Sequence, residues 1–190
     1  MMKHLSDIEI IESVKRGNTA DFSLLIKRYQ DRAFSLLKRL LKNEMDAEEA
    51  LQDCFMKAFN ALKDFRQDAK FSTWFYKIVY NTGLTLIASN KRKLEQEMTS
   101  IDEHFELAAD DDNEIYATSE NARAYVLKIV DMLPVRNALV VILFYVDGLS
   151  LIEISQVLGT SLVNTKVLLH RSRNALRDLL LKHNYQEEML

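Results

Sequence analysis

Turn-forming residues are scarce in this chain, whose 190 residues include only four glycines and one proline. An all-β protein needs such residues in its many tight turns, so this composition argues against a sheet fold. Apolar residues instead recur every three or four positions over long stretches, as they do on one face of an amphipathic helix. The sequence therefore predicts an all-α fold.

Four helix starts are predicted in the first half of the chain. At each start a small polar residue can accept a hydrogen bond from a free backbone amide, in two cases as part of a capping box. A polar break at 64–70, DFRQDAK, separates the third helix from the fourth. Together the four helices can bury one compact core. The expected starting residues are Ser6 with Glu9, Thr19, Asp46 with Glu49, and Ser72.

The segment 149–177 has the pattern of a helix, a tight turn and a basic helix. Ser150 and Glu153 form a capping box, and Gly159 stands where the chain must turn in a left-handed conformation. The second helix is expected to begin near Leu162. This layout is typical of a helix-turn-helix, whose second helix enters the DNA major groove, and an ordinary helical hairpin with a solvated basic face is the alternative. The basic side chains of the second helix are Lys166, His170, Arg171, Arg173 and Arg177.

Charge is unevenly distributed behind a net value of −3. Residues 94–121 hold ten acidic residues and neither lysine nor arginine, whereas residues 1–93 have a net charge of +5 and residues 122–190 one of +2. This pattern predicts two helical domains, 1–93 and 122–190, joined by an acidic linker, 94–121, that repels nucleic acid. In the second domain, helices are expected near 119–132 and 135–146, before the helix-turn-helix. A merely solubilising acidic loop would also fit the charges.

Several functional classes have no support in the sequence. No apolar run approaches the roughly 20 residues that span a bilayer, and the first ten residues do not form a signal peptide. The single cysteine, Cys54, fits the reducing cytoplasm, and its apolar neighbours predict burial. The chain has no P-loop, zinc motif or nucleophile elbow that would indicate catalysis. We therefore expect a cytoplasmic protein that is not an enzyme and that needs no cofactor or metal.

Four blocks of the sequence carry a family resemblance. GNTADFSLLIKRY is the first, MDAEEALQDCFMKAFNAL fits the pattern D-A-E-D-x-x-Q-x-x-F, FRQDAKFSTWFYKIVYN fits F-R-x-x-x-x-F-S-T-W-L-Y-x-I-x-x-N, and LPVRNALVVILFYVDGLSLIEISQVLG is the last. In this order and spacing, over nearly the whole chain, they resemble the extracytoplasmic-function (ECF) sigma factors of bacterial RNA polymerase. The matching positions are Asp46, Ala47, Glu48, Gln52, Phe55, Phe65, Arg66, Phe71, Ser72, Thr73, Trp74, Tyr76, Ile78, Asn81, Leu133, Pro134, Gly148, Glu153, Ile154 and Gly159.

The resemblance implies a transcription initiation factor. Residues 1–93 would be sigma region 2, which binds core RNA polymerase and the minus-ten element. Residues 122–190 would be sigma region 4, whose helix-turn-helix binds the minus-thirty-five element. Such a protein promotes promoter melting, and its partners are core RNA polymerase and promoter DNA, with an anti-sigma factor as a further candidate. The alternative is a stand-alone helix-turn-helix transcriptional regulator, which leaves the FSTWFY block and the acidic linker unexplained.

Residues 65–81 interleave aromatic and cationic side chains, a combination that suits the binding of unpaired bases. The loop RQDAK is the candidate for the polar pocket that a flipped base needs. Helical spacing assigns Trp74, Phe75 and Ile78 chiefly to the core. The expected minus-ten contacts are Arg66, Lys70, Thr73, Lys77 and Asn81, with Lys91, Arg92 and Lys93 at phosphates.

Two further surfaces are expected. The minus-thirty-five contacts would come from Lys166, His170, Arg171, Arg173 and Arg177. By the resemblance, core polymerase would bind Asp46, Glu48, Glu49, Gln52 and Asp53. A polar, acidic face suits a basic partner, and a solvated face with a capping aspartate is the alternative. Departures from the family pattern argue against direct transfer of a promoter consensus, and they lie at Thr85, Ala88, Val167 and Leu168.

Overall fold

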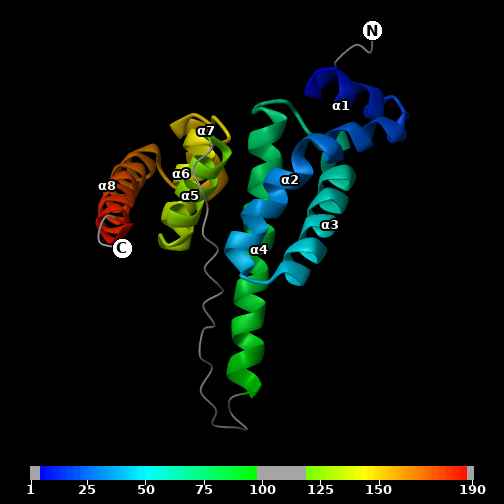
Figure 1. Ribbon diagram of the computed structural model, residues 1–190. Helices are drawn as coiled ribbons and strands as arrows, with labels where there is room; N and C mark the ends of the chain where they lie inside the picture. Colours follow the sequence, from blue (N-terminus) through cyan, green and yellow to red (C-terminus); the bar gives the residue numbers. More distant parts are fainter. Residues whose placement is uncertain (1–4, 98–118, 188–190) are drawn as a thin grey trace. The chain divides into compact units, whose positions relative to one another are not determined.

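The computed structural model describes residues 5–97 and 119–187, apart from the side chains of 92–97, 119–124 and 184–187. Within the described residues all regular secondary structure is helical, which confirms the all-α prediction (Figure 1). None of the described helices is both long enough and apolar enough to cross a membrane. The elements are α1 (Asp7–Lys15), η1 (Thr19–Asp21), α2 (Phe22–Leu41), α3 (Glu44–Ala61), η2 (Leu62–Asp64), α4 (Phe71–Glu97), α5 (Ser119–Asp131), α6 (Val135–Tyr145), α7 (Leu151–Leu158) and α8 (Leu162–Glu187), where η denotes a 3-10 helix.

By their contacts, the residues group into two compact units. Met1–Ala88 with Leu149–Leu162 form the first unit, and Ser89–Gly148 with Val163–Leu190 form the second. The first unit therefore contains α1, α2, α3, most of α4, and α7, whereas the second contains α5, α6 and most of α8.

Local capping signals predicted some helix starts and missed others. The Ser6–Glu9 capping box is present at α1, with the Glu9 amide donating to the Ser6 hydroxyl at 3.3 Å. The expected start at Asp46 is wrong, because Asn43 caps α3 by accepting a hydrogen bond from the Asp46 amide at 3.1 Å. The other two expected starts differ slightly from the observed ones. Thr19 begins η1 ahead of α2, and Ser72 lies inside α4, which begins at Phe71.

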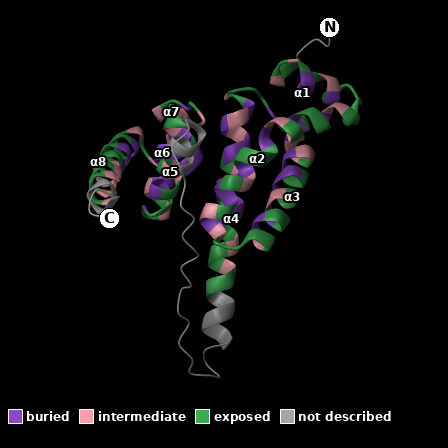
Figure 2. Ribbon diagram, viewed as in Figure 1, coloured by how far each residue is buried: buried purple, intermediate pink, exposed green. Residues whose placement is uncertain are grey.

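Helices α2 and α3 pack side by side and α4 packs against them, with their buried faces turned inward (Figures 1 and 2). On α2 the buried residues recur at the helical period, among them Leu25, Ala33 and Leu40. The α4 backbone approaches α2 closely at Gly83, where an added Cβ would lie 2.7 Å from Leu40 Cδ1. Cys54 is buried in the core, as predicted, and burial raises the pKa of its thiol.

An aromatic cluster joins these three helices. Phe75 of α4 is fully buried, and its ring stacks on Phe55 of α3 at a centroid distance of 4.7 Å. It also lies parallel to the ring of Phe71 at 5.7 Å and meets that of Tyr29 of α2 at 5.9 Å. Such pairs contribute about 0.5–1.5 kcal/mol each beyond the burial of their area. The cluster therefore fixes the position and rotation of the first turns of α4.

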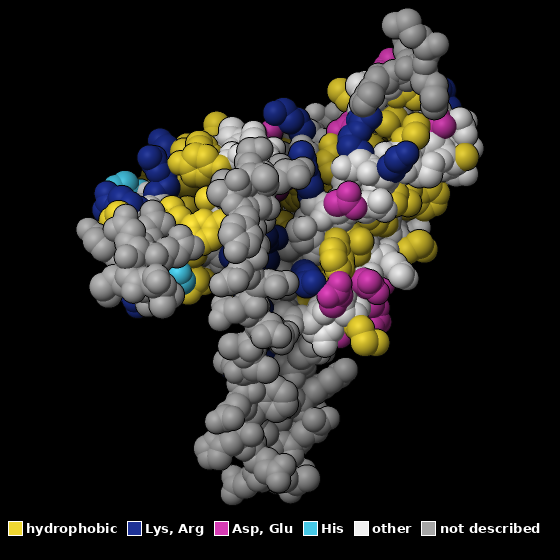
Figure 3. All heavy atoms as spheres, viewed as in Figure 1, with side chains coloured by type: hydrophobic (Ala, Val, Ile, Leu, Met, Phe, Trp, Pro, Cys, Tyr) yellow, Lys and Arg dark blue, Asp and Glu magenta, His cyan; other side chains and the backbone are white. Residues whose placement is uncertain are grey.

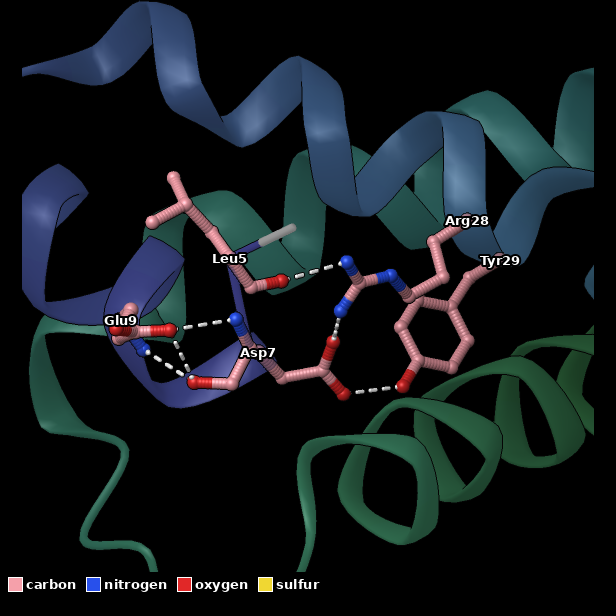
Figure 4. A network of polar contacts seen from close by, with 6 residues as sticks. Leu5, Asp7, Glu9, Arg28 and Tyr29 are labelled. Carbon is pink, nitrogen blue, oxygen red and sulfur yellow. Dashed lines mark hydrogen bonds and ion pairs between the residues drawn. The ribbon is translucent and has the colours of Figure 1, made fainter. Parts of the chain in front are cut away.

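A polar network fastens α1 onto α2 (Figure 4). The Asp7 carboxylate accepts hydrogen bonds from the Arg28 guanidinium and from the Tyr29 hydroxyl. Arg28 also donates to the backbone carbonyl oxygen of Leu5 at 2.8 Å. Burial raises the pKa of Tyr29, and the hydrogen bond to the Asp7 carboxylate raises it further. Tyr29 thus stays protonated and acts as a donor at one end while its ring packs in the core at the other.

The second unit is built around α6, an apolar helix that is buried on almost every side. Every residue from Ala138 to Leu143 is buried. A helix without a polar face is stable only when its neighbours cover it. Ile129 and Val130 of α5 contribute to this core, and Pro134 occupies the N-cap position of α6, between the two helices that the sequence predicted.

We expect Phe75→Ala to destabilise the protein by about 3–5 kcal/mol, because it removes a fully buried ring and leaves a cavity among three helices. Leu84→Ala is the matched control, since Leu84 lies on the same helix and is 42% exposed. The free energy of unfolding, measured in urea for both variants, checks this. Equal losses in the two variants would mean that the aromatic cluster does not hold α4.

Candidate nucleic-acid interface

The loop between η2 and α4 is the predicted base-binding loop, and it lies on the surface. Arg66, Gln67, Asp68 and Lys70 are all exposed. Gln67 has a φ of 62°, in the left-handed region that a non-glycine residue occupies at a cost on the order of 1–3 kcal/mol. A conformation of this kind persists only where the surrounding structure fixes it.

Aromatic rings hold both ends of this loop. Phe65 at its start is 7% exposed, and its ring lies 6.2 Å from that of Phe71 and 4.9 Å from that of Trp74. Phe71 at the loop's end belongs to the aromatic cluster of the core. The backbone that carries the polar side chains of the loop is therefore held in place. A site for a single unpaired nucleobase requires side chains that are positioned in this way.

The exposed face of α4 carries two of the predicted contacts. Lys77 and Asn81 are exposed and lie four residues apart, so they share one side of the helix. Thr73 is different, because it is only 2% exposed and its hydroxyl has no hydrogen-bond partner among the described residues. A buried hydroxyl cannot touch a strand on the surface, so Thr73 does not fit the expected DNA contact.

A surface pocket of about 390 Å³ opens between α3 and α4. Its lining includes the indole of Trp74, which can stack on a nucleobase. It also includes the amide of Asn81, hydroxyl groups and an ammonium group, which can form hydrogen bonds with a nucleobase. Lys57 supplies that ammonium group and donates to the Thr82 hydroxyl at 3.1 Å. The lining residues are Lys57, Ala61, Trp74, Ile78, Asn81, Thr82 and Thr85.

Lys57 lines this pocket, although nothing in the sequence singled it out as a candidate contact. It follows the block of α3 that is expected to bind polymerase, and nothing in that block points to α4. Only the packing of α3 on α4 brings Lys57 beside Asn81. The sequence alone carries no signal that could have found this pair.

The C-terminal part of α4 leads away from this pocket. Lys91 is exposed, whereas the side chains of Arg92 and Lys93 lie outside the described residues. Most of the acidic linker, 98–118, also lies outside them. At the departure Thr85, the hydroxyl donates to the Asn81 carbonyl oxygen at 2.9 Å, so it bonds within its own helix rather than outward.

The predicted polymerase-binding residues share the outer side of α3. Glu48, Glu49, Gln52 and Asp53 are exposed, and Asp46 is half-buried. Figure 3 shows acidic side chains gathered at the N-terminal end of this helix. Two methionines on the same helix, which the sequence did not indicate as contacts, are also exposed. Met45 is 79% exposed and Met56 is 61% exposed. Exposed methionines add adaptable apolar contacts to an otherwise polar surface.

The predicted capping box and turn before the basic helix are confirmed. The Ser150 amide donates to Glu153 Oε2 at 2.7 Å, and the Glu153 amide donates to the Ser150 hydroxyl at 3.3 Å. Within the first unit, Lys70 Nζ lies 3.0 Å from Glu153 Oε1. Partial burial opposes ionisation of Glu153, but the hydrogen bonds from Ser150 and Lys70 outweigh it and lower the pKa of this carboxyl. Gly159 ends α7 with a φ of 61°, in the left-handed region.

Helix α8 begins at Leu162, as predicted, and has a buried side and an exposed side. Thr165, Leu169 and Ser172 are buried on one side. The basic side chains are all exposed, and those spaced by four, three and four residues share one face, with Arg171 turned further round the helix. That face carries Lys166, His170, Arg173 and Arg177.

Comparison with known proteins identifies the family. A family profile described as Sigma-70 region 2 matches residues 25–93, and one described as Sigma-70, region 4 matches residues 123–176. The chain is 31% identical to the ECF RNA polymerase sigma-E factor of Escherichia coli K12 over 182 residues, which cover 93% of this chain and 95% of that protein. The chain belongs to the ECF sigma factors.

Other relatives agree with this assignment. This sigma factor is 32% identical to the ECF RNA polymerase sigma factor SigW of Bacillus subtilis over 88% of its own length and 92% of that protein. The fold is similar to that of the sigma factor RpoE of Bartonella quintana, solved with the anti-sigma factor NepR, with a TM-score of 0.64, 19% identity and coverage of 84% and 96% of the two chains. It is also similar to CnrH, with a TM-score of 0.60, 23% identity and coverage of 90% and 94%. As a sigma factor, the protein is a transcription initiation factor and not an enzyme.

Proposed function

We propose that this sigma factor binds core RNA polymerase, recognises a promoter through two domains and promotes melting of the minus-ten region. One observation carries the proposal: within the residues that match region 2, a fixed polar loop adjoins an exposed helix face with Lys77 and Asn81. Loop, helix face and the nearby pocket supply charge, hydrogen bonds and a stacking surface for an unpaired strand.

The division of labour follows the family matches. Residues 1–93 form the domain for core polymerase and the minus-ten element, residues 122–190 form the domain for the minus-thirty-five element, and 94–121 form the linker. The matches to region 2 and region 4 fall within the first and second of these ranges. Because the protein acts on RNA polymerase at the chromosome, we place it in the cytoplasm.

In the first domain, the proposed strand contacts come from the loop and from α4. The exposed side chains of Arg66, Lys70, Lys77 and Asn81 support this assignment, and Lys57 joins them through the pocket. Of these, Lys70 exchanges its ion pair on α7 for a phosphate when the strand binds. Lysine and arginine supply affinity through phosphates, whereas amide groups such as that of Asn81 can read base edges. The buried threonine of α4 is left out of the set.

The outer side of α3 is the proposed docking surface for core polymerase. Its acidic side chains would attract a basic partner, and the exposed Met45 and Met56 would add apolar contact area. An anti-sigma factor is a further candidate partner, supported by the likeness to the RpoE fold, which was solved with one. A stand-alone helix-turn-helix regulator has no use for this surface or for a region 2 domain.

Purified core RNA polymerase tests this function directly. The full-length protein should co-purify with the core enzyme and should direct run-off transcription from promoters in its source genome, which core enzyme alone does not initiate. A protein that binds duplex DNA but neither joins core enzyme nor supports transcription would be a stand-alone regulator, contrary to the proposal.

In the second domain, Lys166 should contact a base edge, because it lies in the second turn of α8, near the end that a recognition helix presents to the groove. Lys166→Ala should then weaken binding to the preferred minus-thirty-five element by about 1–3 kcal/mol. Lys182→Ala is the control, as an exposed lysine further along the same helix. The affinity of each protein variant is measured on a set of DNA duplexes with altered upstream elements. An equal loss of affinity on every sequence would make Lys166 a phosphate contact instead.

A further inference from the structure

None of the proposed DNA or polymerase contacts lies on helix α1. It spans Asp7–Lys15, and the match to sigma region 2 begins only at residue 25. Its two ends are nevertheless held by side-chain hydrogen bonds, and each leads to one end of the loop 66–70. These connections involve charged groups, whose hydrogen bonds are stronger than those between neutral partners.

The C-terminal end of α1 is bonded directly to the start of the loop. Lys15 Nζ donates to the backbone carbonyl oxygen of Phe65 at 2.7 Å, a bond between residues 50 positions apart. Phe65 has an extended backbone at the point where the chain leaves η2. The bond therefore fixes the direction in which the chain enters the loop.

The N-terminal end of α1 is connected to the other end of the loop through one residue. Asp7 accepts the hydrogen bond from the Tyr29 hydroxyl (Figure 4). The ring of Tyr29 meets that of Phe71, the first residue of α4, at 5.3 Å and 62°. Movement of Asp7 would thus shift Tyr29 and, through the ring contact, Phe71, where the chain leaves the loop.

We propose that α1 is a brace that holds both ends of the loop 66–70 in the conformation that reads an unpaired base, with Lys15 and Asp7 as positioning residues. The inference rests on the proposed function, in which this loop contacts the minus-ten strand. The left-handed conformation of Gln67 supports it, because such a backbone needs surroundings that fix both of its flanks.

The test uses full-length protein assembled with core RNA polymerase and a promoter library randomised across the minus-ten element. Transcript sequencing gives the base preference at each position. Lys15→Met should reduce the preference at the loop-read position by about threefold to tenfold, because it removes a charged donor that orders the loop. Lys15→Arg should restore it, since arginine keeps a donor, and affinity for core polymerase should not change in either variant.

Lys63→Met is the matched control, because it removes an exposed lysine two residues before Phe65. It should leave the preference unchanged, which separates loss of the bond from loss of charge near the DNA. Asp7→Asn tests the other end of the brace and should weaken the same position. Urea unfolding of every variant confirms that it is folded under the assay conditions.

The outcomes separate the two proposals. If wild-type preference is clear and survives both Lys15→Met and Asp7→Asn, with only stability lowered, α1 is a structural element and the inference is overturned. If the wild-type protein shows no minus-ten preference at all, the proposed function itself fails and the inference falls with it.

Discussion

The burial of Phe71 and Phe75 against Tyr29 and Phe55 determines how the rest of the first unit is presented. Because the helix repeats every 3.6 residues, seating these rings in the core turns Lys77 and Asn81 outward. The same packing closes the loop 66–70 between two buried aromatic residues, one before it and one after it. This aromatic cluster therefore positions both the loop and the helix face on which the proposed strand binding depends.

The basic helix α8 follows the same physical rule with a different result. Its buried side is anchored by residues such as Leu169, and the adjoining exposed side carries cations. The departure Val167 is 43% exposed, so an apolar group lies among the cations of this surface. A valine can contact a thymine methyl group but cannot donate to a base edge, which agrees with the argument against direct transfer of a promoter consensus.

Much of the fold could be predicted because local rules decide it, whereas the candidate site depends on tertiary packing. The capping boxes at Ser6 and Ser150 involve only neighbouring residues, and both are present. The prediction that Asp46 caps α3 is wrong, because Asn43, three residues earlier, also suits an N-cap and occupies that position. The hydrogen bond from Lys15 to the backbone carbonyl oxygen of Phe65 could not be predicted from the sequence, because every residue has such an oxygen whatever its side chain.

Permanganate footprinting of the open promoter tests most directly whether α4 and its loop hold the melted strand. Holoenzyme formed with Asn81→Ala or Lys77→Ala should show weaker thymine reactivity in the minus-ten region than wild-type holoenzyme, with core polymerase binding intact. Lys27→Ala, which removes an exposed lysine from α2, should behave as wild type. Unchanged footprints in both α4 variants would contradict the assignment of this helix face to the melted strand.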